Sequence, residues 1–324
     1  MSTKPSFINE LALPVIAAPM FLISGPKLVV ECCKNGIVGT FPALNQRTSE
    51  GFEEWLIEIK TELDAFEKET GKKAAPFGVN LIVHPTNPRL EADVKLCIKH
   101  KVPVVITSLG AVSMVVDAIH SYGGLVFHDI IKKRHAEKAQ EAGVDGLILV
   151  AAGAGGHAGT INPMTLVAEI KKFFHKTIIL SGCISTGRDI ASAMQMGADL
   201  AYMGTRFINT DESKASIEYK KMIIDAGAND VVYTASISGV HANFLGASLK
   251  AAGITEEDLK KDTKIDFGKE LDTEAKAWKT IWSAGQGSAL IENTLPVADL
   301  ISDLKTEFKS AVQDQIMLLE KYPK

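Results

Sequence analysis

The chain has 324 residues, of which 46% are hydrophobic and 6% aromatic, with a mean hydropathy of +0.10. Its formal net charge of -4 and its isoelectric point near 6.1 provide no basic field for nucleic acid or an anionic membrane. No apolar run reaches the roughly 18 residues of a membrane span, and the first ten residues lack a signal-peptide core. We therefore expect a cytoplasmic protein that acts on a small molecule.

Eight short apolar segments alternate with longer helical patterns over about the first 200 residues. Strands of a parallel sheet are buried on both faces and read as such continuous apolar runs. The helical segments carry apolar residues at i, i+3, i+4 and i+7, as from Phe52 to Phe66 and from Leu166 to Phe174. This alternation predicts a (β/α)8 TIM barrel, or failing that a doubly wound sheet. The predicted strands are Leu13–Ala18, Ile37–Phe41, Phe77–Leu81, Val104–Thr107, Leu125–His128, Leu147–Val150, Thr177–Ser181 and Leu200–Met203.

Three regions are predicted from the change of pattern after Met203. Residues 1–209 form the barrel, and residues 210–280 are polar and helical in pattern, which indicates a smaller helical cap domain. Residues 281–324 contain a loop around Gly285 and a final amphipathic helix that packs back on the barrel. Its apolar side consists of Val297, Leu300, Ile301, Leu304, Phe308 and Val312.

A glycine-rich segment with one histidine follows the sixth predicted strand. Gly153, Gly155, Gly156 and Gly159 surround His157. Such glycines let the backbone approach a ligand closely, and the strand ends of a barrel are where its enzymes keep their chemistry. An imidazole titrates near neutral pH, so His157 is the candidate catalytic base. The competing interpretation is a tight crossing with a surface histidine.

The seventh and eighth predicted strands end in small residues. Ser181-Gly182-Cys183 follows one, and Gly204-Thr205 follows the other. In barrel enzymes these two loops form a phosphate site from backbone N–H groups. Small residues at strand ends are also common packing devices, but two consecutive ends favour the phosphate site.

The first and third predicted strands end in residues suited to a ring system. Ala18-Pro19-Met20 could lay a flat apolar surface against a ring, although a methionine at a core edge is the commoner case. The amide of Asn80, if buried, needs partners that a heterocycle edge would supply, and capping of the next loop is equally compatible. His84, His128 and Asp129 could in principle bind a metal, but we expect no catalytic metal, and no cysteine stands at zinc-ligand spacing.

Several of these segments recur together in one known family. They are Ala18-Pro19-Met20, Gly78-Val79-Asn80-Leu81, Ala154-Gly155-Gly156-His157-Ala158-Gly159, Ser181-Gly182-Cys183-Ile184, Gly197-Ala198-Asp199, Met203-Gly204-Thr205-Arg206-Phe207 and the loop Trp282-Ser283-Ala284-Gly285-Gln286. As an ensemble they resemble the nitronate monooxygenase family, once called 2-nitropropane dioxygenases. The phosphate-site segment alone also resembles other barrels such as inosine monophosphate dehydrogenase.

The resemblance implies a barrel that binds FMN non-covalently beneath a smaller helical domain. It implies that His157 is the active-site histidine, acting as a base or holding the nitro group, and that Gln286 lies at the substrate. Cofactor contacts are expected from Ala18, Pro19, Met20, Asn80, His128, Gly155, Ser181, Gly182, Cys183, Gly204 and Thr205. The implied reaction oxidises an alkyl nitronate, or a nitroalkane, with dioxygen to a carbonyl compound and nitrite.

Two departures from the family pattern bear on the substrate. Cys183 replaces a second glycine that is common after the seventh strand, which backbone N–H donation should tolerate. Some relatives carry a lysine near the end of strand five, where this chain has His128-Asp129. A negative Asp129 near the cofactor would disfavour an anionic substrate.

Three functions remain open from the sequence. The first is nitronate oxidation without a nicotinamide. The second is an NAD(P)H-dependent FMN reductase acting on a quinone or an enoyl thioester, since a nicotinamide can dock over a flavin without a dinucleotide fingerprint. The third is a flavin-binding barrel without turnover, which the retention of His157 disfavours. A homodimer is compatible with all three.

Overall fold

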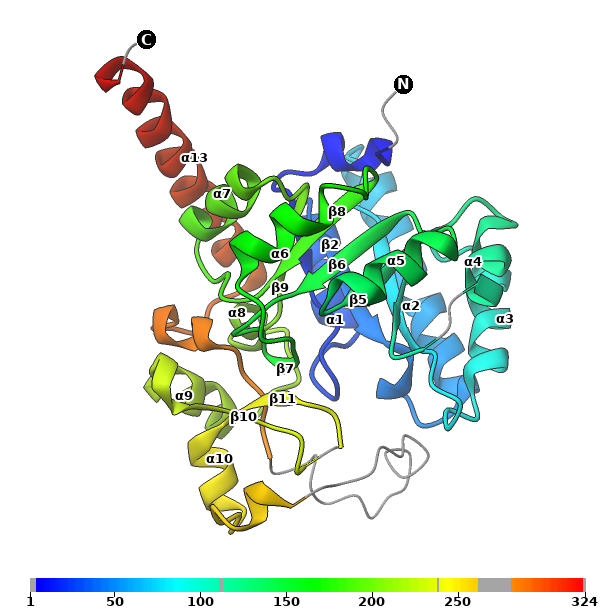
Figure 1. Cartoon of the computed structure of the whole chain (residues 1–324). Coiled ribbons are helices and arrows are strands. Elements are labelled where there is room, and N and C mark those ends of the chain that lie inside the picture. The colour runs from blue at the N-terminus through cyan, green and yellow to red at the C-terminus, as the bar shows by residue number, and fades with distance from the viewer. Residues whose placement is uncertain (1–3, 111–112, 238, 262–280, 323–324) are drawn as a thin grey trace.

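Eight parallel strands close into a barrel surrounded by helices, as the sequence predicts (Figure 1). The computed structural model describes residues 4–110, 113–237, 239–261 and 281–322. The barrel runs in the order β1-β2-β3-β4-β5-β6-β8-β9 and closes where Val15 of β1 lies opposite Ala201 of β9. The strands are β1 Val15–Ala17, β2 Val38–Pro42, β3 Phe77–Ile82, β4 Val104–Ser108, β5 Leu125–Ile130, β6 Gly146–Val150, β8 Thr177–Ser181 and β9 Leu200–Met203.

The strand register sorts side chains into an inner and an outer layer. Ile106 of β4 lies opposite Phe127 of β5, and both belong to the cluster that fills the barrel. Their neighbours Val105 and Val126 point the other way, into the larger cluster between strands and helices. Because side chains alternate along a strand, each residue's partner in register tells which layer it occupies.

Some of the surrounding helices begin at a residue whose side chain accepts from one of their first N–H groups. The Thr48 hydroxyl accepts from the Gly51 N–H, and the Asn162 side chain accepts from the Met164 N–H ahead of Pro163. The helices of this layer are α1 Pro26–Lys34, α2 Ser49–Thr70, α3 Leu90–His100, α4 Ser113–His120, α5 Lys133–Glu141, α6 Pro163–Ile170, α7 Gly187–Met196 and the short α8 Thr205–Ile208.

The N-terminal segment lies at the end of the barrel away from the cap (Figure 1). Its short helix η1, Ser6–Glu10, carries Phe7 and Ile8, which with Leu11 pack against the inner cluster. A second short helix, η2, covers Ala43–Asn45 after β2. The carboxyl ends of the strands therefore open at the other end, toward the cap.

The cap contains helices, as predicted, together with a small sheet that the sequence analysis did not foresee. Strands β10 Val231–Thr234 and β11 Ala242–Leu245 pair antiparallel, and the barrel loop adds β7, Gly156–His157. Residues 262–280 of the predicted cap lie outside the described residues. The helical elements are α9 Ile217–Asp225, η3 Ala228–Asp230, α10 Gly246–Ala251 and η4 Asp258–Lys260.

The C-terminal part returns to the barrel. After η5, Gln286–Leu290, helix α13, Val297–Lys321, packs on α7 with Val297, Leu300, Ile301 and Leu304 buried. The two helices approach so closely that a Cβ at Gly187 would lie 2.2 Å from the Leu304 carbonyl oxygen. Within the described ranges, no helix has the length and apolar character needed to cross a membrane.

Candidate active site

The loops after β6, β8 and β9 meet the segment 284–287 at the carboxyl end of the barrel. The Gln286 N–H donates to the Gly153 carbonyl oxygen at 2.9 Å, and the Gly285 N–H donates to the Thr205 hydroxyl at 2.9 Å. The Cys183 sulfur lies 3.9 Å from the Gln286 side-chain oxygen. Four of the predicted site segments therefore meet at this carboxyl end of the barrel, the barrel mouth.

Two glycines of the β6 loop, Gly153 and Gly155, are required by this contact between loops. A Cβ at Gly155 would lie 2.8 Å from the Gly285 nitrogen, and one at Gly285 would lie 2.6 Å from the Gly153 carbonyl oxygen. Gly153 itself has a φ of +79°, in the left-handed region that favours glycine. Close packing against residues 284–287 is therefore enough to require glycine at these positions, without any contact to a ligand.

The ends of β8 and β9 leave backbone donors free. Gly182 and Cys183 have φ values of +123° and +57°, and their N–H groups, like that of Gly204, have no acceptor in the part of the chain that the structure describes. Thr205 begins α8, where the first N–H groups of a helix are unpaired. Converging free N–H groups can bind an anion such as a phosphate.

A side chain at Gly204 would make only ordinary contacts beside the end of β1. A Cβ at Gly204 would lie 3.6 Å from the Ala18 Cβ and 3.9 Å from the Met20 sulfur, which are ordinary contacts. Its φ of -100° suits any residue. Neither packing nor backbone conformation within the described residues therefore requires a glycine here. The structure also places Ala18-Pro19-Met20 beside Gly204, with the Ala18 N–H donating to the Met203 carbonyl oxygen at 2.9 Å.

His157 is held by the strand that links the barrel to the cap. It lies on β7 opposite Ala242 of β11, and the Ala158 N–H after it donates to the His241 carbonyl oxygen at 3.2 Å. The residue is half-buried, but its Nε2 atom is inaccessible to solvent and has no hydrogen-bond partner among the described residues. Burial lowers the pKa of the imidazole from 6.5 to about 4, so the ring is neutral at pH 7.

A polar row crosses three neighbouring strands on the inner layer. The Asn80 Nδ2 on β3 donates to the Ser108 Oγ on β4 at 2.9 Å, and the Ser108 hydroxyl donates to the Asp129 Oδ2 on β5 at 2.5 Å. Burial raises the pKa of Asp129 from 3.8 to about 7. Asp129 thus carries less negative charge at neutral pH than its sequence suggests, which weakens the expected repulsion of an anion. The sequence analysis missed Ser108, although a polar residue ending the strand beside Asn80 is a signal for it.

His128 does not reach the barrel interior. It lies opposite Thr107, one position out of step with the inner pair Ile106 and Phe127, and its Nδ1 is 2.8 Å from the Thr107 hydroxyl. Burial lowers the pKa of His128 to about 4. The register thus assigns the His128 side chain to the outer layer, away from the row formed by Asn80, Ser108 and Asp129, and a contact of His128 with the cofactor stays a prediction.

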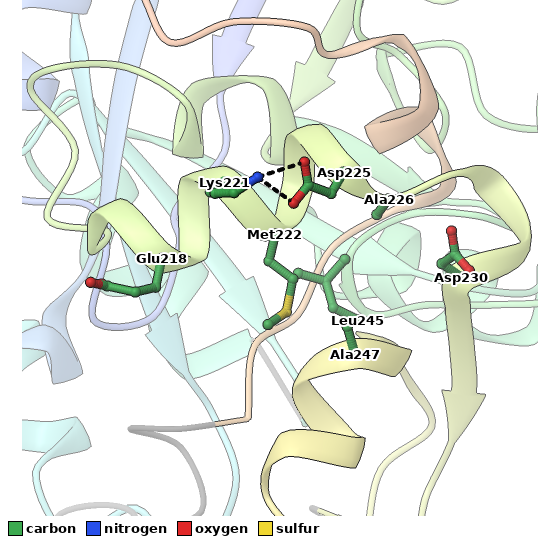
Figure 2. A pocket seen from close by; sticks show the side chains of 8 residues that line it. All are labelled: Glu218, Lys221, Met222, Asp225, Ala226, Asp230, Leu245 and Ala247. Atoms are coloured by element: carbon green, nitrogen blue, oxygen red, sulfur yellow. Dashed lines mark hydrogen bonds and ion pairs between the residues drawn. The ribbon is translucent and has the colours of Figure 1, made fainter.

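No cluster of three or more His, Cys, Asp or Glu suited to a metal ion occurs among the residues described here. A cleft of about 460 Å³ opens on the cap instead, lined by α9, η3 and the start of α10 (Figure 2). In it, the Lys221 ammonium pairs with the Asp225 carboxylate at 2.8 Å. None of the predicted site residues lines this cleft, so the barrel mouth remains the candidate active site.

Comparison with known proteins bears on the chemistry of this mouth. A family model described as "Nitronate monooxygenase" matches residues 5–307. A nitronate monooxygenase of Paraburkholderia phytofirmans is 24% identical, with 93% of each chain covered. The (3aS,4S,5R,7aS)-5-hydroxy-7a-methyl-1-oxo-octahydro-1H-indene-4-carboxyl-CoA dehydrogenase of Rhodococcus jostii is 26% identical over 77% of this chain and 68% of that one. The structure of FabK from Thermotoga maritima superposes with a TM-score of 0.78 at 25% identity, covering 96% of this chain and 97% of FabK.

Proposed function

Because this chain belongs to the nitronate monooxygenase family and is an oxidoreductase, we propose that it is an FMN-dependent nitronate monooxygenase. The enzyme oxidises an alkyl nitronate, or the parent nitroalkane, with dioxygen to a carbonyl compound and nitrite. The observation that carries this proposal is the Nε2 of His157, which is sealed, unpartnered among the described residues and neutral at pH 7.

The residues at the barrel mouth fit FMN. The free N–H groups of Gly182, Cys183 and Gly204 suit its phosphate, and no packing contact of the described residues requires the glycine at 204. The buried Asn80 amide has an oxygen with no donor among the described residues, which a ring N–H can satisfy. Bound FMN supplies an electron-accepting ring at the mouth.

His157 positions the substrate or takes its proton. A neutral imidazole with an unpaired Nε2 can accept the α-proton of a nitroalkane, as a general base does. In the other tautomer, Nε2–H donates to an oxygen of a nitronate that is already ionised. Gln286, held beside Cys183 and Gly153, offers an amide at the same mouth for the polar end of the substrate.

A second candidate rests on the relative from Rhodococcus jostii, whose name describes a dehydrogenase of a carboxyl-CoA compound. In that case the chain is an NAD(P)H-dependent FMN reductase for a quinone or an enoyl thioester. Neutral His157 would then supply or accept a proton at the same mouth.

Turnover in air distinguishes the two candidates. The FMN-loaded protein is mixed with ethyl nitronate or with NADH plus a quinone, while dioxygen uptake and nitrite are measured. The proposal expects nitrite and dioxygen uptake with the nitronate, and neither from protein stripped of FMN. NADH consumption coupled to quinone reduction, without nitrite from the nitronate, would replace the proposal by the reductase.

A further inference from the structure

Asn80, Ser108 and Asp129 form a chain of hydrogen bonds in which each residue comes from a different strand. Asn80 lies opposite Ile106, two positions before Ser108 on β4, so both side chains face the barrel interior. Asp129 lies opposite Ile148, which also belongs to the inner cluster. The three side chains therefore sit on one face, linked at 2.9 Å and 2.5 Å.

The inventory of protons fixes the direction of this chain. Above its pKa of about 7 the ionised Asp129 carboxylate only accepts, so the single hydroxyl proton of Ser108 goes to Asp129. The Ser108 oxygen must then accept from Asn80, and only the NH₂ half of the Asn80 amide can donate. The carbonyl half is left as an acceptor with no donor among the described residues.

The stability of the fold does not account for a carboxyl group at position 129. Its Oδ1 is sealed and has no hydrogen-bond partner in the described part of the chain. An unsatisfied buried polar atom destabilises a fold by about 1–3 kcal/mol. Burial raises the pKa of the Tyr202 phenol on β9, and the nearby charge of Asp129 raises it further, so Tyr202 does not neutralise that charge.

We propose that Asp129 is a positioning residue which, through Ser108, sets the carbonyl end of the Asn80 amide toward the ring of the bound cofactor. The ligand feature recognised is a ring N–H on a fused heterocycle, as FMN presents. This inference rests on the proposed function for the identity of that ring. Without the carboxylate, the Ser108 hydroxyl is free to donate to Asn80, and the amide turns its NH₂ end outward.

A double-mutant cycle on FMN binding tests this route. The variants Asp129→Leu, Ser108→Ala and the double variant are titrated with FMN at pH 8.5, where Asp129 is ionised, and the dissociation constant is read from quenching of FMN fluorescence. Each single variant should raise the dissociation constant about tenfold, as for one lost hydrogen bond. The double variant should raise it by the same factor, because residues of one relay are not additive.

A conservative variant and a matched control complete the design. Asp129→Asn keeps an acceptor oxygen for Ser108, so it should bind FMN at least threefold more tightly than Asp129→Leu. Thr107→Val removes a buried hydroxyl from the same strand on the outer layer, and should leave the dissociation constant unchanged. The melting temperature of Asp129→Leu should equal or exceed that of the wild type, since an unpaired polar atom is removed.

Three results would overturn the inference. They are unchanged binding in Ser108→Ala, additive effects in the double variant, and equal losses in Asp129→Asn and Asp129→Leu, which would mean that Asp129 acts by charge. Should Asp129→Leu not fold, Ser108→Ala against Thr107→Val still decides. Failure of the wild-type protein to bind FMN would instead reject the proposed function.

Discussion

His157 lies opposite Ala242 in the antiparallel pairing of β7 with β11, so the strand that carries the imidazole also joins the barrel to the cap. A second histidine, His241, directly precedes β11; it is exposed, and its ring stacks on Tyr233 at a centroid distance of 5.1 Å. The two histidines therefore differ in burial although both lie at the same small sheet.

That difference predicts opposite outcomes for two alanine variants. His157→Ala should lower turnover of the nitronate by about 10²–10⁴-fold, the usual effect of losing an acid–base group, with FMN still bound. His241→Ala is the matched control and should stay within about twofold of the wild type. Turnover is measured as nitrite formed per bound FMN; equal activity of His157→Ala and the wild type would remove His157 from the mechanism.

Replacement of Gly204 should expel the cofactor without unfolding the protein. A leucine side chain there fits the backbone, whose φ is -100°, and its first carbon meets nothing closer than 3.6 Å. The rest of the side chain enters the space assigned to the phosphate. Gly204→Leu should therefore be purified colourless, with a melting temperature near that of wild-type protein stripped of FMN. A yellow, fully loaded variant would show that the phosphate lies elsewhere.

Acid should destabilise the protein through its buried histidines. The pKa values of His128 and His157 are about 4 in the fold, against 6.5 for an unperturbed histidine. Between these values the unfolded chain binds protons that the folded chain does not, so the free energy of unfolding falls as the pH drops from about 6.5 toward 4. Asp129 opposes this, because with a pKa of about 7 it keeps a proton in the fold that the unfolded chain has lost.

Urea unfolding at pH 7 and pH 5 measures this linkage. In the wild type, the two histidines outweigh the single aspartate, so stability should be lower at pH 5. His157→Ala should lose less stability between the two pH values than the wild type, because one of the two histidines is gone. An equal loss in both proteins would show that His157 is not held neutral by burial.

The contact between α7 and α13 predicts a stability defect far from the mouth. A Cβ at Gly187 would lie 2.2 Å from the Leu304 carbonyl oxygen and 2.4 Å from the Phe308 nitrogen, so Gly187→Ala must separate the helices. We expect it to lower the free energy of unfolding by about 1–3 kcal/mol, as overpacking does. Gly227→Ala meets only the Asp230 side chain at 3.4 Å and should change stability by less than about 0.5 kcal/mol. Equal stabilities in urea would contradict this packing.

The barrel could be predicted because its signals are local. Each barrel strand is a short apolar run, and the helix from Ser49 to Thr70 buries Phe52, Trp55 and Leu56 at helical spacing. The small sheet of the cap could not be predicted. Its strand β7 is only two residues long and exists because Ala242 and Asn243, far along the chain, pair with it.

The sequence indicates which strand ends carry the candidate site, but not which side chains of those strands point into the barrel. Because neighbouring residues of a strand point to opposite sides, the choice between His128 and Asp129 depends on a register that one sequence does not reveal. Pairing with Thr107 puts His128 outside, and pairing with Ile148 puts Asp129 inside. The link from Asp129 to Asn80 through Ser108 likewise appears only when three strands are aligned.

The most direct test of nitronate oxidation at this mouth is anaerobic reduction of the bound flavin. The FMN-loaded protein is mixed without dioxygen with ethyl nitronate and, separately, with NADH, while the visible flavin absorption is followed. We predict rapid bleaching by the nitronate, none by NADH, and strongly slowed bleaching in His157→Ala. Bleaching by NADH with no response to the nitronate would contradict the account and identify the protein as a reductase.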